Sequence, residues 1–310
     1  ICLNKMFTLR NMSRIKHPEK QYLELVDHIL KHGYKEKGRN GNVLTHIGAA
    51  MRFQLYDEDR GNKPIVPLMT TKKVAWKTCL KELLWFMKGD TDNKTLQKQG
   101  VNIWDGNSSR EFLDSRGLNY REGDLGPIYG HQWRHFNARY YAADYNCDGI
   151  GVDQLEMLVR NLKDPEKRNS RRMILTAWNP CQLSQMALPP CHVLSQFHVV
   201  DDDKLICTLY QRSADVGLGL PFNIASYSFL THIMAHHCGL KASELVHFIG
   251  NAHIYEDHIE PLKEQLEEYP KLYPTLEIKN IREKIDGYEI EDFEIKDYKF
   301  SKKINMEMRA

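Results

Sequence analysis

Several features that mark other classes of protein are missing from this sequence. Its seven cysteines are scattered, odd in number and without a C-x-x-C pair, which argues against a disulfide framework and a cysteine-rich zinc site. No apolar run approaches the roughly 20 residues that span a bilayer, so no membrane partner is expected. A formal net charge of +2 gives no reason to expect nucleic-acid binding. These absences favour a reducing compartment, and we expect the chain to be cytoplasmic, or nuclear or mitochondrial in a eukaryote.

The chain reads as one continuous unit. No internal repeat, low-complexity tract or linker rich in Pro, Gly or Ser divides it, which favours a single domain. Residues 1–20 lack the long apolar segment and the cleavage site of a secretory signal. We therefore expect an N-terminal extension over residues 1–20, which could be disordered, and one domain over residues 21–310.

Hydrophobic spacing predicts helices interspersed with strands. The predicted helices cover residues 22–31, 74–87 and 224–238, each followed closely by a glycine. The predicted strands cover residues 173–178, 193–200 and 205–211, and the last two form a hairpin around residues 201–204. This pattern favours an α/β (α+β) protein in which helices cover a mixed sheet.

Cys191 is a candidate nucleophile because of its setting. It follows two prolines, which fix the backbone and withhold two N–H donors, and it precedes a predicted strand. A thiol with a pKa near 8.5 is mostly protonated at neutral pH, so a nearby cation must raise the thiolate fraction. Taken alone, a buried and inert cysteine is the commoner case.

Other residues could hold a phosphorylated and hydroxylated ligand. The fork of Arg212 beside the hydroxyl of Ser213 suits a phosphate, and the glycines that follow allow a ligand to approach the backbone. Further cationic candidates are Arg39, Arg171 and Arg172. Two residues apart in an extended segment, His253 and Tyr255 would point the same way, toward ligand hydroxyls or into the core. For each arginine, a solvated ion pair is the alternative.

Glu82 is a candidate acid–base group. It precedes an apolar and aromatic stretch, 83–86, where burial would raise its pKa toward neutrality, although an ordinary helix-surface glutamate is the alternative. His232 and His236 have the i, i+4 spacing of zinc-binding helices but lack the intervening glutamate, so no metal is expected there.

Taken together, seven segments closely resemble the signature blocks of the thymidylate synthases. They read ELLWF at 82–86, IWD at 103–105, GDLGPIYG at 123–130, LPPCH at 188–192, YQRSAD at 210–215, LPFNIASY at 220–227 and AHIY at 252–255. They occur in the family's order and spacing from about Gln21 to the C-terminus. Residues 121–124 and 306–308 are similar to the eukaryotic or large-DNA-virus branch. The resemblance implies one domain with a mixed, mostly antiparallel sheet covered by helices, and a homodimer formed through the sheets.

The resemblance also implies a reaction. It is the reductive methylation of dUMP to dTMP, with 5,10-methylenetetrahydrofolate giving both carbon and hydride and leaving as dihydrofolate. The thiolate of Cys191 would add to carbon-6 of uracil. The partner subunit would supply Arg171 and Arg172, and four guanidiniums around one phosphate would lower the pKa of a nearby thiol. No metal is needed.

The resemblance assigns roles position by position. The catalytic positions are Cys191, Glu82, Tyr129, Asn223, Asp215 and Trp104. The positions that bind dUMP are Arg39, Arg171, Arg172, Gln211, Arg212, Ser213, Asp215, Asn223, His253 and Tyr255. The positions that bind the folate are Ile103, Trp104, Asn107, Asp215, Leu218, Gly219, Phe222, Met308 and Ala310.

The sequence departs from the family pattern at a few places. The loop after Arg39 is one residue shorter, which bears on how it closes and on the role of Arg39. Ala75 stands where a bulky aromatic side chain is common, so the folate pocket is expected to be wider. Arg309 replaces a small residue near the C-terminus, and we expect activity to survive this change. Ala214 and Asn251 are further small departures.

Three rival functions follow from the same residues. A nucleotide hydroxymethylase would trap water instead of hydride, but Trp104 opposes water entry, and the deoxycytidylate-specific relatives carry Asp at the position of Asn223. A cysteine hydrolase would pair Cys191 with His192 or His253, although adjacent strand residues point to opposite faces. A regulator that binds nucleotide or RNA without reaction would not need the reactive groups. RNA binding as a side activity is not indicated.

Overall fold

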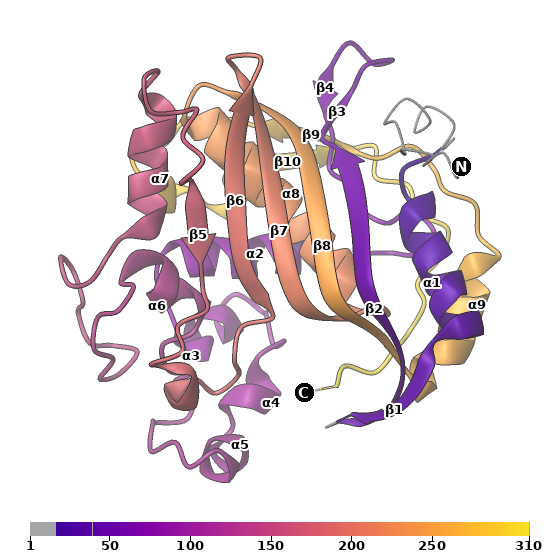
Figure 1. Ribbon diagram of the computed structural model, residues 1–310, viewed down its shortest axis with the longest axis horizontal. Helices are drawn as coiled ribbons and strands as arrows, with labels where there is room; N and C mark the ends of the chain where they lie inside the picture. The colour runs from indigo at the N-terminus through magenta and orange to yellow at the C-terminus, as the bar shows by residue number, and fades with distance from the viewer. Residues whose placement is uncertain (1–16, 39, 310) are drawn as a thin grey trace, which may run out of the picture.

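The computed structural model describes residues 17–38 and 40–309, and its frame is a six-stranded sheet (Figure 1). The strand order is β1 (Tyr34–Gly38), β2 (Gly41–Gln54), β8 (Lys241–Tyr255), β7 (Lys204–Asp215), β6 (His192–Val200) and β5 (Ile174–Thr176). Every neighbouring pair is antiparallel except β7 and β8, which run parallel. The predicted mixed, mostly antiparallel sheet is confirmed.

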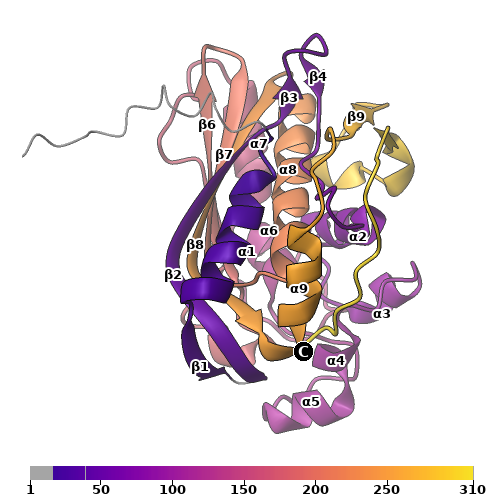
Figure 2. The ribbon, with the colours of Figure 1, turned by 90° about the vertical axis from the view of Figure 1, so that its right-hand side faces the viewer.

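Helices cover one face of this sheet, as the edge-on view shows (Figure 2). The longer ones are α1 (Lys20–His32), α2 (Trp76–Met87), α7 (Gln154–Lys163), α8 (Gly219–His237) and α9 (Ile259–Leu266). Short helices are α3 (Asn93–Gln97), α4 (Asp105–Ser108), α5 (Arg110–Ser115) and α6 (Tyr129–Arg134), with 3-10 turns η2 (Leu183–Gln185), η3 (Glu256–His258), η4 (Ile285–Gly287) and η5 (Ile290–Asp292). Two small ribbons complete the fold, β3 (Tyr56–Asp57) with β4 (Lys63–Pro64) and β9 (Thr275–Ile278) with β10 (Phe293–Lys296).

Helix α8 is the centre of the core. Most of its side chains are buried all the way round, as expected for a helix enclosed between a sheet and a second helix, here α2. The sequence predicted its start five residues too late, at Ile224. The helix begins at Gly219 because Pro221 falls in its first turn, where the missing N–H leaves no hydrogen bond unmade.

The predicted hairpin is confirmed as β6 and β7. Asp201 and Asp202 in its turn adopt positive φ angles of 48° and 66°, the geometry that matches the twist of a tight hairpin and that Asp tolerates better than most residues. The register set by this turn holds from Val200 opposite Lys204 to Leu194 opposite Tyr210, and a shift between Leu194 and His192 then places His192 opposite Gln211 at the far end of the ribbon. The predicted helices at 22–31 and 74–87 correspond to α1 and α2, and the strand at 173–178 to β5.

Part of the expected N-terminal extension is joined to the domain. Residues 1–16 lie outside the described residues, but Glu19 is fully buried. One carboxylate oxygen of Glu19 accepts from the backbone N–H (2.9 Å) and hydroxyl (2.5 Å) of Thr70, and the other from those of Thr71 (2.8 and 2.6 Å). These four bonds satisfy a buried charge and tie the start of α1 to the segment before α2. No helix in the described chain is long and apolar enough to cross a bilayer.

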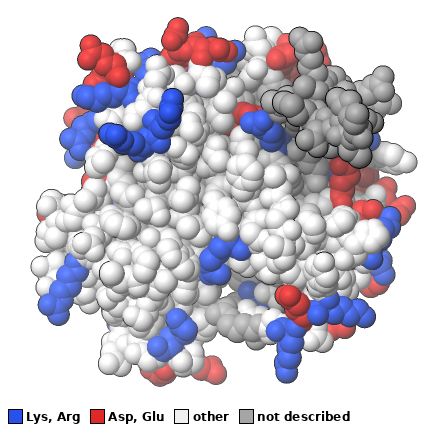
Figure 3. Space-filling view, viewed as in Figure 1, with Lys and Arg blue, Asp and Glu red and all other residues white. Residues whose placement is uncertain are grey.

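The second face of the sheet carries few charges and several exposed apolar side chains. Ile47, Tyr210 and Phe248 are 60%, 43% and 44% exposed on β2, β7 and β8. The space-filling view along this face shows a broad uncharged area over the strands, with most Lys, Arg, Asp and Glu toward the rim (Figure 3). Contiguous apolar surface of this kind marks an interaction face.

Candidate active site

Cys191 lies in the turn that leads into β6, where Arg212 of β7 holds it. The guanidinium of Arg212 donates to the carbonyl oxygens of Pro190 (Nε, 2.9 Å) and Pro189 (Nη2, 3.0 Å), and its Nη2 lies 3.8 Å from Cys191 Sγ. The backbone N–H of Arg212 also donates to the carbonyl of Cys191 at 2.9 Å. One arginine therefore fixes the prolyl turn and places a positive charge beside the sulfur, which favours the thiolate.

Tyr129, at the start of α6, holds the same turn from the other side. Its hydroxyl oxygen accepts from the backbone N–H groups of Cys191 (2.8 Å) and His192 (3.4 Å). Burial raises the pKa of Tyr129 well above its usual value, so the phenol is neutral over the physiological range. Its ring packs against Phe86 of α2, with centroids 4.7 Å apart. The backbone around Cys191 is therefore fixed by the neutral hydroxyl of Tyr129 as well as by the cationic side chain of Arg212.

Glu82 of α2 lies in an aromatic wall. The indole N–H of Trp104 donates to its carboxylate at 2.7 Å. Burial raises the pKa of Glu82 from 4.5 to about 7, although the Trp104 hydrogen bond opposes the shift. The side chain is therefore present as acid and as carboxylate in comparable amounts near neutral pH, which suits a group that moves protons.

A chain of amides orients Asn223 at the start of α8. Gln211 Nε2 donates to Asn223 Oδ1 at 2.8 Å, and Gln211 Oε1 lies 2.9 Å from His247 Nε2. Because this oxygen can only accept, the His247 nitrogen is the donor. Burial lowers the pKa of His247 to about 3, so its ring is neutral at physiological pH. The amide of Asn223 is held in one orientation, which makes it able to read a ligand edge.

His192 is not placed to activate the thiol. Its ring is buried between Tyr129 and Tyr227, at centroid distances of 5.2 and 5.1 Å. Burial lowers the pKa of His192 to about 4, so it carries no charge at neutral pH. The geometry opposes the Cys191–His192 pair of a cysteine hydrolase, and the cation beside the sulfur is Arg212.

Asp215 ends β7 as an ionised carboxylate. It accepts from the backbone N–H groups of Gly217 (2.9 Å) and Leu218 (3.3 Å), and its Oδ1 lies 3.5 Å from His258 Nδ1. Burial alone would raise the pKa of Asp215, but His258 and the Gly217 N–H outweigh it and hold the pKa below its ordinary value. A Cβ on Gly217 would lie 2.5 Å from His258 Nδ1, so only glycine permits this approach.

A cavity of about 680 Å³ brings many of the predicted residues together. The predicted site residues in its wall are Asn107, Cys191, Arg212, Ser213, Asp215, His253 and Tyr255. The sequence prediction gave no role to six other polar residues that also line it, Glu36, Asn40, Thr45, Arg116, Asn251 and Arg309, of which it noted only Asn251, Arg309 and the loop that contains Asn40 as departures. His247 contacts Gln211 and His258 contacts Asp215, and no motif had singled out either histidine.

The other predicted residues that the structure describes do not line this cavity wall. Among them are five residues whose contacts are given above: Glu82, Trp104, Tyr129, Gln211 and Asn223. Arg171 and Arg172 are exposed just before β5, and Arg172 lines a separate small hollow. Ile103, Leu218, Gly219 and Phe222 are partly exposed around α4 and the start of α8, and Met308 is 55% exposed in the tail. Arg39 and Ala310 lie outside the described residues, so their roles stay predictions.

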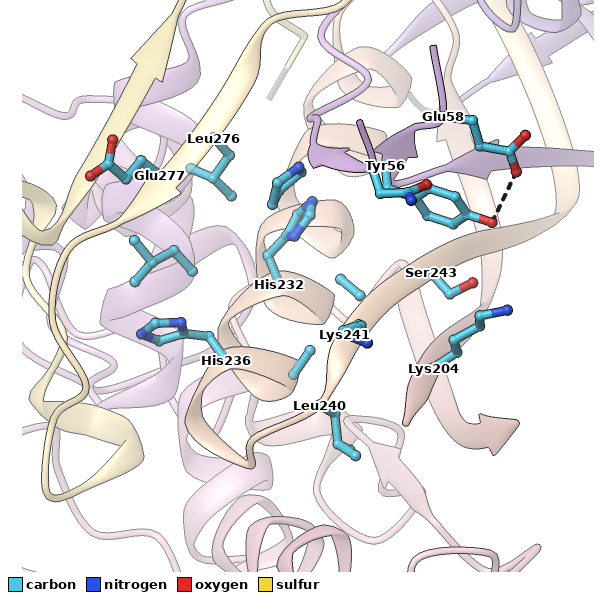
Figure 4. A pocket seen from close by; sticks show the side chains of 15 residues that line it. Tyr56, Glu58, Lys204, His232, His236, Leu240, Lys241, Ser243, Leu276 and Glu277 are labelled. Atoms are coloured by element: carbon cyan, nitrogen blue, oxygen red, sulfur yellow. Dashed lines mark hydrogen bonds between the residues drawn. The ribbon is translucent and has the colours of Figure 1, made fainter. Parts of the chain in front are cut away.

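A larger cavity of about 740 Å³ lies away from these groups, beside the start of β8 (Figure 4). It is lined by His232 and His236 of α8, but none of the predicted site residues reaches it. The Nε2 atoms of the two histidines contact different backbone carbonyls, those of Ile65 (2.8 Å) and Asn280 (3.1 Å). Across residues 17–38 and 40–309, no group of three His, Cys, Asp or Glu side chains could hold a metal ion.

Comparison with known proteins agrees with this geometry. Residues 20–310 match the family model described as thymidylate synthase. The chain belongs to the thymidylate synthase family. It is 50% identical over 297 residues to the thymidylate synthase of Homo sapiens, covering 95% of this chain and 92% of that protein. It is 47% identical over 298 residues to thymidylate synthase 1/2 of Encephalitozoon cuniculi, covering 95% and 98%.

The family includes longer proteins as well. The chain is 50% identical over 295 residues to the bifunctional dihydrofolate reductase-thymidylate synthase of Leishmania major, covering 94% of this chain and 55% of that one. It thus spans about half the length of these bifunctional relatives. The predicted family, its α/β fold and its eukaryotic resemblance are confirmed, and the reaction of thymidylate synthases is the methylation of dUMP to dTMP.

Proposed function

We propose that this chain converts dUMP to dTMP, with 5,10-methylenetetrahydrofolate as the donor of carbon and hydride. The observation that carries the proposal is the setting of Cys191, whose thiol lies 3.8 Å from Arg212 Nη2 in a cavity that also exposes Ser213, Asp215 and His253. A thiolate stabilised by a neighbouring cation is a good nucleophile for an electron-poor ring carbon. Arg212 and Ser213 supply donors for the phosphate of the same nucleotide.

The proposed steps balance in atoms and electrons. The sulfur of Cys191 forms a bond to carbon-6 of uracil, and the ring π electrons move to the carbonyl at carbon-4 as an enolate. Carbon-5 attacks the methylene carbon of the folate as the bond from that carbon to nitrogen-10 breaks. Carbon-5 then loses its proton, and the remaining methylene–nitrogen bond, to nitrogen-5, breaks to release tetrahydrofolate and leave an exocyclic methylene on the ring. The tetrahydrofolate gives a hydride to the exocyclic methylene and becomes dihydrofolate, and the thiolate leaves. The methylene is reduced to methyl while the folate is oxidised, so no other redox partner is needed.

During these steps Glu82 would transfer protons and Trp104 would exclude water. With a pKa of about 7, Glu82 can donate a proton toward the developing enolate and take it back. Trp104 is buried and fixed by its hydrogen bond to Glu82, so its ring can shield a methylene intermediate from water. This arrangement favours hydride transfer over the water capture of a hydroxymethylase.

Asn223→Asp is expected to move specificity from dUMP toward dCMP. The Asn223 amide can donate to the uracil carbonyl and accept from the ring N–H, whereas cytosine presents an amino donor and an unprotonated ring nitrogen. We expect the ratio of kcat/KM for dUMP over dCMP to fall by at least about a hundredfold, since an unpaired buried polar group costs this much. Initial rates with each nucleotide measure the ratio. Asn251→Asp, the same change at a residue of the cavity wall, is the matched control and should leave the ratio unchanged.

The direct test of the proposed function is dihydrofolate formation. The protein is mixed with dUMP and methylenetetrahydrofolate, and the absorbance of dihydrofolate is followed with and without dUMP. Dihydrofolate that appears only with dUMP, together with dTMP, supports the proposal. Transfer of carbon without dihydrofolate would instead establish a hydroxymethylase, and binding of dUMP without either product would establish a regulator.

We also propose that the active protein is a homodimer packed through the open sheet face. The exposed side chains of Ile47, Tyr210 and Phe248 give this face an apolar surface suited to a second copy. Arg171 and Arg172 are exposed and do not line their own chain's cavity. In the proposed dimer each subunit contributes this pair to the phosphate site of its partner, so one site needs two chains.

Complementation between two inactive variants tests this sharing. Cys191→Ser lacks the nucleophile, and the double variant Arg171→Ala/Arg172→Ala lacks the shared cations. After co-refolding in equal amounts, half the dimers are mixed and each has one intact site, so activity should recover to about a quarter of wild type. Recovery near zero, with mixed dimers verified by differently tagged subunits, would show that the arginines do not act across subunits.

A further inference from the structure

The C-terminal tail, residues 301–309, runs back over the helical layer (Figure 2), and its last described residue, Arg309, lines the active-site cavity. Its first part is tied by backbone hydrogen bonds, from Ser301 N–H to Thr70 O (2.8 Å) and from Lys73 N–H to Lys302 O (2.9 Å). Beyond Lys302 the tail contains no helix or strand in its described part, so side-chain contacts, including the packing of Met306 against the core, hold it in place.

One of those contacts joins the tail to a carboxylate of the site. His258 Nε2 lies 2.7 Å from the carbonyl oxygen of Glu307, which can only accept, so this nitrogen donates. The other ring nitrogen of His258 lies 3.5 Å from Asp215 Oδ1. Met306 packs beside Gly217 in the same corner, with its sulfur 3.0 Å from the position that a Cβ on Gly217 would take.

The last described residue of the tail, Arg309, makes a second contact of a different kind. Its Nη2 lies 2.8 Å from Asp257 Oδ2, and the two side chains are 37% and 34% exposed. Arg309 lines the same cavity as Cys191 and Arg212, and it also lines an adjoining hollow of about 420 Å³ with residues 40–42 and 255–257. The ion pair therefore joins Arg309, in the tail, to η3 beside the cavity.

We propose that the Arg309–Asp257 ion pair is a latch that keeps the C-terminal tail docked over the cavity, and that Arg309 is thereby a positioning residue for the folate co-substrate. The proposal rests on the proposed function, since it concerns the second substrate of that reaction. Asp257 is adjacent to His258, so both tail contacts use one short turn, η3, as their anchor. If this ion pair anchors the tail, the tail should open measurably more often when the pair is lost.

An alternative role for Arg309, as a cation that attracts the substrates, predicts the opposite effect of Asp257→Asn on KM. If Arg309 acted only as a cation that attracts the anionic substrates, removing the charge of Asp257 would strengthen its effect and lower KM. If the pair is a latch, Asp257→Asn and Arg309→Ala both release the tail and both raise KM. The direction of the Asp257→Asn effect therefore separates the two.

The test combines tail exposure with kinetics in the full-length protein. Hydrogen–deuterium exchange of residues 303–309 is measured without substrates, so this reading does not depend on activity. We expect faster exchange in Arg309→Ala, in Asp257→Asn and in the double variant, and a two- to fivefold higher KM for methylenetetrahydrofolate, roughly the effect of a part-exposed ion pair. Arg309→Lys should restore part of both. Lys263→Ala, which breaks an exposed ion pair with Glu260 on α9, is the matched control and should change neither.

The outcomes separate the latch from the proposed function. If wild-type protein forms no dihydrofolate, the proposed function fails, whereas the exchange measurement still reports on the ion pair. In an active enzyme, unchanged exchange in Arg309→Ala, or faster exchange with an unchanged folate KM, would overturn the latch. So would additive effects in the double variant, because partners in one ion pair lose the interaction only once.

Discussion

Cys191→Ser is expected to lower the rate of dihydrofolate formation by at least about a thousandfold, the size of loss seen when an enzyme loses its nucleophile. A serine hydroxyl is protonated at neutral pH and needs a neighbouring base. His192 is a poor candidate for this base, because its ring is buried between Tyr129 and Tyr227 and its pKa is about 4. The cation of Arg212 stabilises a thiolate but cannot take a proton.

The measurement is the initial rate at saturating dUMP and folate, with dUMP affinity determined separately. Affinity should change little, because the phosphate and ring contacts involve other side chains. Cys181→Ser is the matched control, since Cys181 is exposed and outside the cavity wall, and it should retain full activity. Substantial turnover by Cys191→Ser would show that the nucleophile lies elsewhere.

Glu82→Gln is expected to reduce kcat by about a hundred- to ten-thousandfold, the usual contribution of a positioned acid–base group. Glutamine keeps the size of the side chain and can still accept the indole N–H of Trp104, but it cannot move a proton. In the wild type, the pH profile of kcat should show an inflection near the pKa of Glu82, about 7, and this inflection should be absent from the variant.

The same substitution should stabilise the fold in a pH-dependent way. Folding raises the pKa of Glu82 from 4.5 to about 7, so the wild type loses stability as the pH rises through this window, and the variant does not. Above pH 7 the free energy of unfolding of Glu82→Gln should exceed that of wild type by up to about 3 kcal/mol, and below pH 4.5 the two should agree.

Denaturant unfolding at several pH values measures this difference, and Glu260→Gln on the exposed side of α9 is the control. A difference that is constant with pH would show that Glu82 has an ordinary pKa in the folded protein. Its proposed role as a proton relay would then lose its physical basis.

Local patterns predicted α1, α2, most of α8 and the hairpin because their causes are local, whereas α7 and α9 were not predicted. Apolar spacing marks α1 and α2, and Asp201 and Asp202 favour the tight turn between β6 and β7. The parallel pairing of β7 with β8 has no such signal, since α8 separates the two strands in the chain and only tertiary packing brings them together. The sequence analysis did not predict the long strands β2 and β8 either, because their formation also depends on tertiary packing.

Motif resemblance named most of the candidate site but not its supports. It picked out Cys191 and Arg212, yet the bonds from Arg212 to two prolyl carbonyls appear only once β6 and β7 pair. His258 and Arg309 were missed because the tail meets η3 from far along the chain. Such contacts depend on how distant segments fold back, which neither periodicity nor a motif records.

The central claim is covalent catalysis by Cys191, and trapping the adduct tests it most directly. In 5-fluoro-dUMP the hydrogen on carbon-5 is replaced by a fluorine that cannot leave as a cation, so the reaction should stop with nucleotide and folate joined to the enzyme. Intact-protein mass spectrometry should then show the added mass of both molecules, and peptide mapping should place it on Cys191. No adduct in an enzyme that turns over dUMP, or an adduct on another residue, would contradict the account.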